Sequence, residues 1–78
     1  MLNVANANRN EMYKIKSMNF ANNQILHRLY ALGFTEGSLI KIKQKSLFNG
    51  PCTLDKDGQQ ICIRNCDACQ IVLEHVHG

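Results

Sequence analysis

Long apolar runs are missing from this chain of 78 residues, and its N-terminus lacks the basic-then-apolar order of a signal peptide. Both absences predict a cytoplasmic protein that does not insert into a membrane by itself and keeps its cysteines reduced. Basic charge is also sparse, since the net charge is +3 and charged residues make up 19% of the chain. Aromatic residues do not alternate with basic ones along any strand. The composition therefore predicts no nucleic-acid partner.

Catalytic motifs are absent as well. No serine or cysteine has an evident base partner, and Asp55, Asp57 and Asp67 flank turns, where aspartate commonly caps backbone groups. The chain has no glycine-rich loop of the kind that holds phosphates. We therefore expect a protein that is not an enzyme, so that any nucleotide hydrolysis belongs to a partner.

The length allows one domain, near the lower size at which a hydrophobic core suffices. Residues 1–10 contain four asparagines and almost no apolar pattern, which predicts a flexible leader. Residues 11–74 are expected to form the domain. Residues 75–78 are predicted to be a frayed tail, in which His75 and His77 would chelate a metal weakly at best.

Local patterns predict one helix among about five short strands. Ile25, Leu29 and Leu32 recur at helical spacing, and Gly33 follows as the helix terminator. Asn22 or Asn23 is placed to cap this helix, and Gly37 is the turn residue that leads into the next strand. The expected strands are 12–16, 39–45, 52–55, 59–64 and 70–74, with a hairpin turn at Gly58 and a short turn or single helical turn at 65–69.

The strand at 39–45 places Ile40 and Ile42 on one face and Lys41, Lys43 and Lys45 on the other. We interpret the lysines as the solvated side of a half-buried strand, although they would also suit an acidic partner. So many short strands are best protected by closure into a barrel. The prediction is a mainly β fold with one inserted helix, a small SH3-like β-barrel.

An ordered set of residues resembles the ferrous iron transport protein A family (FeoA) and covers about 13–73. The matching positions are Leu29, Leu32-Gly33-Phe34, Gly37, Ile40, Ile42, Gly50-Pro51, Gly58, Ile61, Ile63-Arg64, Ala68, Ile71 and Leu73. The same barrel also resembles the C-terminal module of iron-dependent repressors.

The resemblance implies a small accessory protein of bacterial ferrous iron uptake. Its expected partner is the membrane transporter FeoB, contacted through the transporter's cytoplasmic GTP-binding portion, which would recruit the protein to the inner face of the membrane. Candidate contacts are His27 and Arg28 on the helix and Phe48 and Asn49 in the loop 47–51. We expect no required cofactor, and at most weak binding of a transition metal.

Four cysteines support an alternative reading. Cys62, Cys66 and Cys69 have the spacing C-x3-C-x2-C, and Cys52 lies in the preceding strand. Thiolates this close in sequence can share one ion, so a transition-metal-binding or iron-sensing module is the second hypothesis. We favour structural cysteines, because Cys52 and Cys62 lie in apolar strands, where a thiol behaves as a small hydrophobe.

Overall fold

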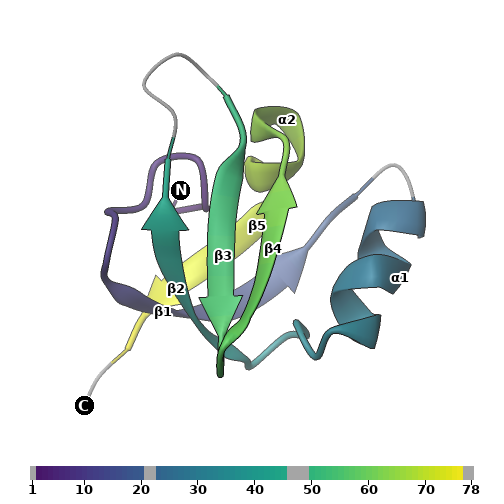
Figure 1. Ribbon diagram of the computed structural model, residues 1–78, viewed down its shortest axis with the longest axis horizontal. Helices are drawn as coiled ribbons and strands as arrows, with labels where there is room; N and C mark the ends of the chain where they lie inside the picture. The colour runs from purple at the N-terminus through teal and green to yellow at the C-terminus, as the bar shows by residue number, and fades with distance from the viewer. Residues whose placement is uncertain (1, 21–22, 46–49, 77–78) are drawn as a thin grey trace.

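Five antiparallel strands form a single sheet whose spatial order differs from chain order. The computed structural model describes residues 2–20, 23–45 and 50–76. The strands are β1 (Met12–Met18), β2 (Leu39–Gln44), β3 (Cys52–Lys56), β4 (Gln59–Ile63) and β5 (Ile71–His75). They are arranged β4-β3-β2-β1-β5, so the first strand lies between the second and the last (Figure 1). Helix α1 (Asn23–Ala31) follows β1, and the one-turn helix α2 (Asn65–Ala68) joins β4 to β5.

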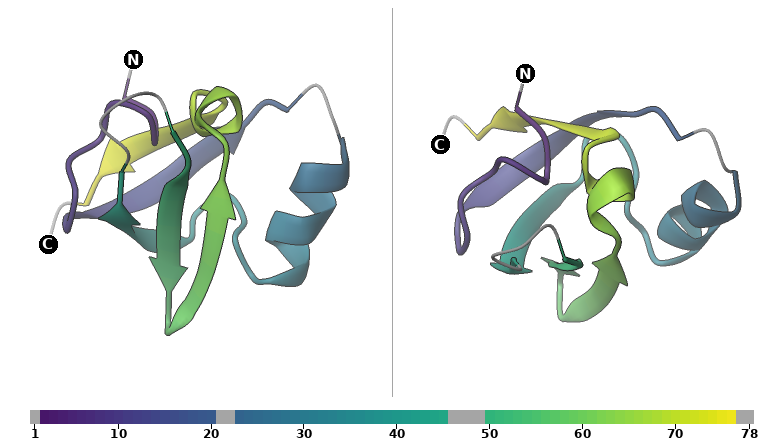
Figure 2. Two further views of the ribbon diagram at one scale, coloured as in Figure 1. Left: turned by 45° about the horizontal axis from the view of Figure 1, so that its top comes forward. Right: turned by 90° about the horizontal axis from the view of Figure 1, so that it is seen from above.

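The sheet bends around the core. Seen from above, β1 and β5 lie on one side and β3 and β4 on the other, with α1 at one end (Figure 2). Alternate residues of each strand point inward, as a sheet with one buried face requires. The largest fully buried side chains are Tyr13, Phe34, Ile15, Leu29, Ile40, Ile42, Leu54, Ile71 and Val4.

The mainly β fold is confirmed, but the sheet is not closed. Strands β4 and β5 end the strand order, and α2 connects them where a ladder would have closed a barrel. Closure was expected because short strands need protected edges. The N-terminal residues protect the β5 edge instead: Asn3 forms a bridge with Val72, the Val4 N–H donates to Ile71 O (3.2 Å) and the Leu73 N–H donates to Leu2 O (2.9 Å).

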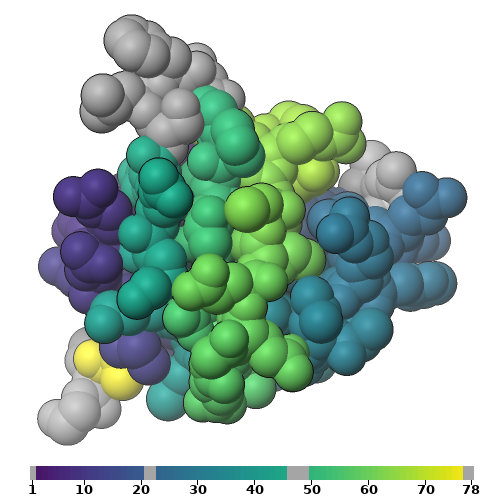
Figure 3. Space-filling model, viewed as in Figure 1, coloured from purple at the N-terminus to yellow at the C-terminus, as the bar shows by residue number. Residues whose placement is uncertain are grey.

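The prediction of a flexible leader at 1–10 is therefore wrong for residues 2–10. Val4 is 0% exposed and Ala7 is 1% exposed, and both belong to the core. The Lys45 ammonium donates to Ala7 O at 2.7 Å, and the Asn10 N–H donates to Ile42 O at 2.7 Å. These bonds hold the segment beside β2 (Figure 3).

Helix α1 ends as predicted. Gly33 has φ +87° and Gly37 has φ +89°, conformations that side chains with a Cβ rarely adopt. The Phe34 N–H donates to Leu29 O at 2.8 Å and returns Phe34 to the core. Asn23 is the first helical residue, whereas Asn22 lies outside the described residues.

Two further predictions concern the chain's second half. The hairpin turn between β3 and β4 is confirmed, with Asp57 at φ +53° and Gly58 at φ +86°. The prediction of a frayed tail at 75–78 placed the end of the domain one residue too early. His75 is the last residue of β5 and pairs with Tyr13. Its ring lies 5.8 Å from the Tyr13 ring, between centroids.

Candidate interaction surface

Three large apolar side chains are exposed near the ends of β1, β2 and β5. Met12 is 49% exposed, Leu39 is 47% exposed and Val76 is 42% exposed. Met12 and Leu39 occupy outward positions of β1 and β2, since their neighbours Tyr13 and Ile40 are buried and paired with each other. We call the outward side of β1, β2 and β5 the outer face. Apolar groups gathered on such a face are more informative than singly scattered ones.

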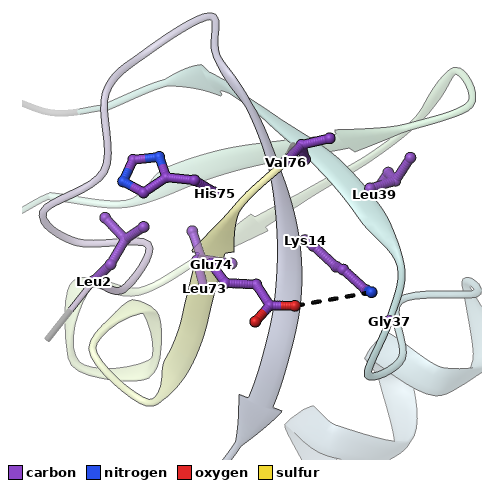
Figure 4. Close-up of a pocket in the computed structure, with 8 residues that line it drawn as sticks. All are labelled: Leu2, Lys14, Gly37, Leu39, Leu73, Glu74, His75 and Val76. Atoms are coloured by element: carbon purple, nitrogen blue, oxygen red, sulfur yellow. Dashed lines mark ion pairs between the residues drawn. The ribbon is translucent and has the colours of Figure 1, made fainter. Parts of the chain in front are cut away.

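Leu39 lies between two hollows of the outer face. The first has a volume of about 640 Å³ and is bordered by Leu2, Leu39, His75 and Val76 (Figure 4). Within it, Lys14 Nζ and Glu74 Oε1 approach to 3.8 Å, with both side chains nearly half exposed. An ion pair this open to water contributes little to stability, so both groups are available to a partner.

The second hollow is bordered by Met12 and Leu39, by Lys41, Lys43 and Lys56, and by Asp55 and Asp57. Lysines outnumber carboxylates on the outward positions of β1, β2, β3 and β5, which carry Lys14, Lys16, Lys41 and Lys43 against Asp55 and Glu74. The exposed apolar residues therefore lie in a basic surround. This combination suits an apolar segment with acidic neighbours.

The turn before β2 fixes where Leu39 is presented. The Gly37 N–H donates to Ile15 O at 2.7 Å, and the Ile15 N–H donates to Ser38 O at 2.9 Å. The Ser38 hydroxyl donates to Gly33 O at 3.1 Å, which links the turn to the end of α1. Leu39 thus follows a turn bonded on both sides, and a docking residue held this way loses little freedom on binding.

Tyr13 points inward between the outward residues Met12 and Lys14, and its hydroxyl links β1 to the N-terminal segment. The Asn8 N–H donates to the Tyr13 hydroxyl (2.9 Å), and that hydroxyl donates to Glu11 Oε2 (2.9 Å). Burial raises the pKa of Tyr13 above its usual 10.0, and the Glu11 carboxylate raises it further, while the hydrogen bond from Asn8 lowers it. The hydroxyl is therefore neutral at physiological pH and keeps both bonds.

Two of the four contacts predicted from the sequence, His27 and Arg28, lie on α1 and not on the outer face. His27 and Arg28 are exposed on α1, and Arg28 borders a hollow together with Cys62 and Asp67. Phe48 and Asn49 lie outside the described residues. The sequence analysis missed the exposure of Leu39. The alternation of 39–43 indicated it, because Leu39 lies on the same face of the strand as Lys41 and Lys43 and not on the face of Ile40.

The cysteines occupy three different environments. Cys52 is buried in β3, as expected, and burial raises the pKa of its thiol, an effect that Lys45 partly offsets. Cys62 is exposed, contrary to its interpretation as a small core residue. It points outward because Ile61 and Ile63 on either side point inward. Its Sγ lies 3.3 Å from Thr53 Oγ1.

Cys66 and Cys69 lie in and directly after α2, where a short turn or a single helical turn was predicted, and both are exposed. Within residues 2–20, 23–45 and 50–76, no three His, Cys, Asp or Glu side chains are grouped so as to hold a metal ion. No described helix is long and apolar enough to cross a membrane.

Comparison with known proteins agrees with this geometry. The family model described as the FeoA domain matches residues 2–75. The chain belongs to the FeoA domain family. Membership indicates a role in ferrous iron transport and confirms the resemblance drawn from the sequence. The match begins at residue 2, in keeping with the packed N-terminal segment. No curated protein sequence matches the chain.

Solved structures confirm the SH3-like fold. The FeoA protein of Chlorobium tepidum superimposes with a TM-score of 0.86 at 18% identity, over 99% of this chain and 72% of that one. Iron(II) transport protein A of Clostridium thermocellum gives 0.81 at 21% identity, over 96% of this chain and 46% of that one. The manganese regulator SloR gives 0.76 at 23% identity, with 96% of this chain matching 34% of the regulator.

Proposed function

We propose that this FeoA domain is a non-enzymatic accessory protein that binds the cytoplasmic GTP-binding portion of a FeoB-type ferrous iron transporter. Family membership supports the iron-transport role. The observation that carries the binding role is the exposed group of Met12, Leu39 and Val76 in a basic surround. A preformed surface of this kind acts by binding one conformation of its partner better than another and thereby shifting the population.

The partner surface that fits is an apolar segment flanked by carboxylates. Leu39 would enter the apolar part, and Lys41 and Lys43 would face the acidic part. Leu39 lies at the centre of the proposed contact, between the two hollows. Central, partly enclosed apolar residues contribute most to binding, whereas charges at the border mainly set the association rate.

Leu39→Glu tests this surface, with His27→Glu as the matched control. Both variants place one carboxylate at an exposed position, the first on the outer face and the second on α1. We expect Leu39→Glu to weaken binding to the purified cytoplasmic portion of the transporter by about 2 kcal/mol, roughly 30-fold. It should also lower ferrous iron uptake in cells, while His27→Glu leaves both unchanged. Thermal unfolding of each variant verifies that the fold is retained.

Two results would contradict the proposal at different levels. Normal uptake in cells that have the transporter but lack this chain would remove the accessory role. Weak binding by His27→Glu together with normal binding by Leu39→Glu would keep that role and move the contact to α1, one of the two places that the sequence alone had suggested.

A further inference from the structure

Two exposed thiols share the single turn that joins β4 to β5. Cys66 is the second residue of α2, and Cys69 is the residue that ends it. Figure 2 shows α2 at the margin of the molecule, between the ends of the two strands. Neither thiol belongs to the outer face, and both are free and exposed.

The backbone fixes the spacing of these two residues. The Ala68 N–H donates to Arg64 O (2.9 Å), the Cys69 N–H donates to Asn65 O (3.1 Å), and Cys69 has helical dihedrals of φ −65° and ψ −19°. In a helical turn, residues three apart lie on one face. A rise of about 1.5 Å per residue on a Cα radius of about 2.3 Å puts their Cα atoms about 5 Å apart. Disulfides span roughly 4.4–6.8 Å between Cα atoms, so the backbone need not move.

The rest of the turn keeps the thiols outside. Ala68 is fully buried between them in sequence and anchors the turn on the core. The Gln70 N–H donates to Asp67 O (2.9 Å), and the Asn19 N–H donates to Gln70 O (3.0 Å), which ties the end of the turn to the residue after β1. With Ala68 directed inward, Cys66 and Cys69 are directed to solvent.

We infer that Cys66 and Cys69 form a dithiol site that small-molecule disulfides oxidise reversibly to an intramolecular disulfide. The thiolate of one cysteine attacks the small disulfide, forms a mixed disulfide and releases one small thiol. The second cysteine, as thiolate, then attacks the protein sulfur of that mixed disulfide. The Cys66–Cys69 bond forms, and a second small thiol leaves with the remaining proton. The protein loses two electrons and two protons, and the small disulfide gains them.

Cys52 and Cys62 differ from this pair in ways that exclude them from the site. Cys52 is 2% exposed and cannot meet a small disulfide. Cys62 is accessible, but it lies on the outward side of β4, beside Thr53. A mixed disulfide at Cys62 therefore has no second thiol on its own element to resolve it. Cys62 therefore serves as an internal control: it is an accessible cysteine without a partner thiol on its own strand.

Digestion with trypsin, which cuts after lysine and arginine, places Cys52, Cys62 and the Cys66–Cys69 pair on three different peptides. The peptide 65–78 contains Cys66 and Cys69, the peptide 57–64 contains Cys62, and the peptide 46–56 contains Cys52. The reduced full chain is equilibrated with mixtures of reduced and oxidised glutathione, alkylated with iodoacetamide, digested and weighed by mass spectrometry.

We expect the peptide 65–78 to lose alkylation at both cysteines together, and to weigh two hydrogens less than the unalkylated reduced form. Cys62→Ser should leave this result unchanged. Cys66→Ser should abolish the internal bond and leave Cys69 alkylated or carrying glutathione. Recovery of both alkylated cysteines on adding reduced glutathione would support reversibility.

The inference is overturned if Cys66 and Cys69 in the unaltered chain stay alkylated, or carry glutathione singly, in the oxidising mixtures. It is equally overturned if Cys66 or Cys69 is found joined to Cys52, to Cys62 or to a second chain, and Cys52 is included because Cys69 lies near enough to act on its thiol electrostatically. Each outcome is independent of iron uptake, so failure here leaves the proposed accessory role standing.

Discussion

The N-terminal segment, residues 2–10, and helix α1 both pack beside the sheet, but the segment has two fully buried side chains and the helix has one. The segment has no periodic pattern and is rich in asparagine, yet it buries Val4 and Ala7 completely. Helix α1 has the apolar spacing of an amphipathic helix, yet Leu29 is its one buried residue, with Ile25 and Leu26 partly covered. The apolar spacing predicted correctly that α1 would be a helix. It did not predict that residues 2–10 would contribute to the core, because that depends on their backbone hydrogen bonds to the sheet.

The two segments are attached in different ways. Residues 2–4 run along β5 through backbone hydrogen bonds, and residues 7–10 are held by Lys45, Tyr13 and Ile42. Helix α1 returns to the core at its C-terminal end, where the Phe34 N–H meets Leu29 O. The helix therefore leaves more of its surface to solvent, as the lobe beside β4 in Figure 3 shows.

Val4→Asp should have the largest effect on stability. The carboxylate would replace a side chain that is 0% exposed, and no buried residue is charged in the part of the chain that the structure describes, so we expect a loss on the order of 3–5 kcal/mol. Urea unfolding measures the loss. Asn10→Asp adds the same charge at an exposed residue of the segment, and aspartate tolerates the φ of +67° found there. If the two variants unfold at the same urea concentration, Val4 is not packed in the core and the prediction of a flexible leader stands.

Leu29→Ala should have the next largest effect. Leu29 is 0% exposed, and truncating a fully buried leucine costs about 2–5 kcal/mol. His27→Ala, two residues earlier on the exposed side of α1, should change stability by less than about 0.5 kcal/mol. If both variants unfold at the same urea concentration, the helix is not anchored through Leu29.

Tyr13→Phe should have the smallest effect, and one that depends on pH. At neutral pH the loss of two hydrogen bonds should cost about 0.5–1.5 kcal/mol each at most. Because the folded pKa of Tyr13 lies above 10.0, the native state holds this proton more tightly than the unfolded chain does. The stabilisation is complete below about pH 10 and is lost as pH rises through the folded pKa.

The difference in unfolding free energy between the unaltered chain and Tyr13→Phe should therefore shrink above pH 10. Tyr30 and Cys52 also have raised pKa values, but both are present in the two proteins, so their contributions cancel in the difference. A difference that stays constant up to pH 11 would show that the Tyr13 hydroxyl does not link the N-terminal segment to β1.

Much of the fold could be predicted because it depends on local chemistry. Glycine alone suits the φ values at Gly33 and Gly37, and the alternation at 39–43 sets the buried face of β2. The burial of Val4 could not be predicted, because it depends on the position of β5, which is nearly the whole chain away in sequence. The placement of β5 beside β1 could not be predicted either, because it too depends on contacts between residues far apart in sequence.

The candidate site was predicted less well, for two physical reasons. The exposure of Leu39 and of Cys62 follows from the alternation of inward and outward residues along β2 and β4. That alternation predicts exposure only once it is known which face of the strand is buried. The proposed pairing of Cys66 with Cys69 needs the 65–69 turn to be helical. The sequence left a helical turn as one of two alternatives, because a segment of that length has no periodicity to decide between them.

The bridge between Asn3 and Val72 bears on how this domain should be handled and fused. Strand β5 has β1 on one side and residues 2–4 on the other, so at residues 71–73 its backbone is already paired on both sides. Displacing those residues, for instance with a rigid tag attached directly to Leu2, would uncover the edge of β5. Such an edge is a template for strand exchange between copies, so aggregation would accompany the loss of Val4 from the core.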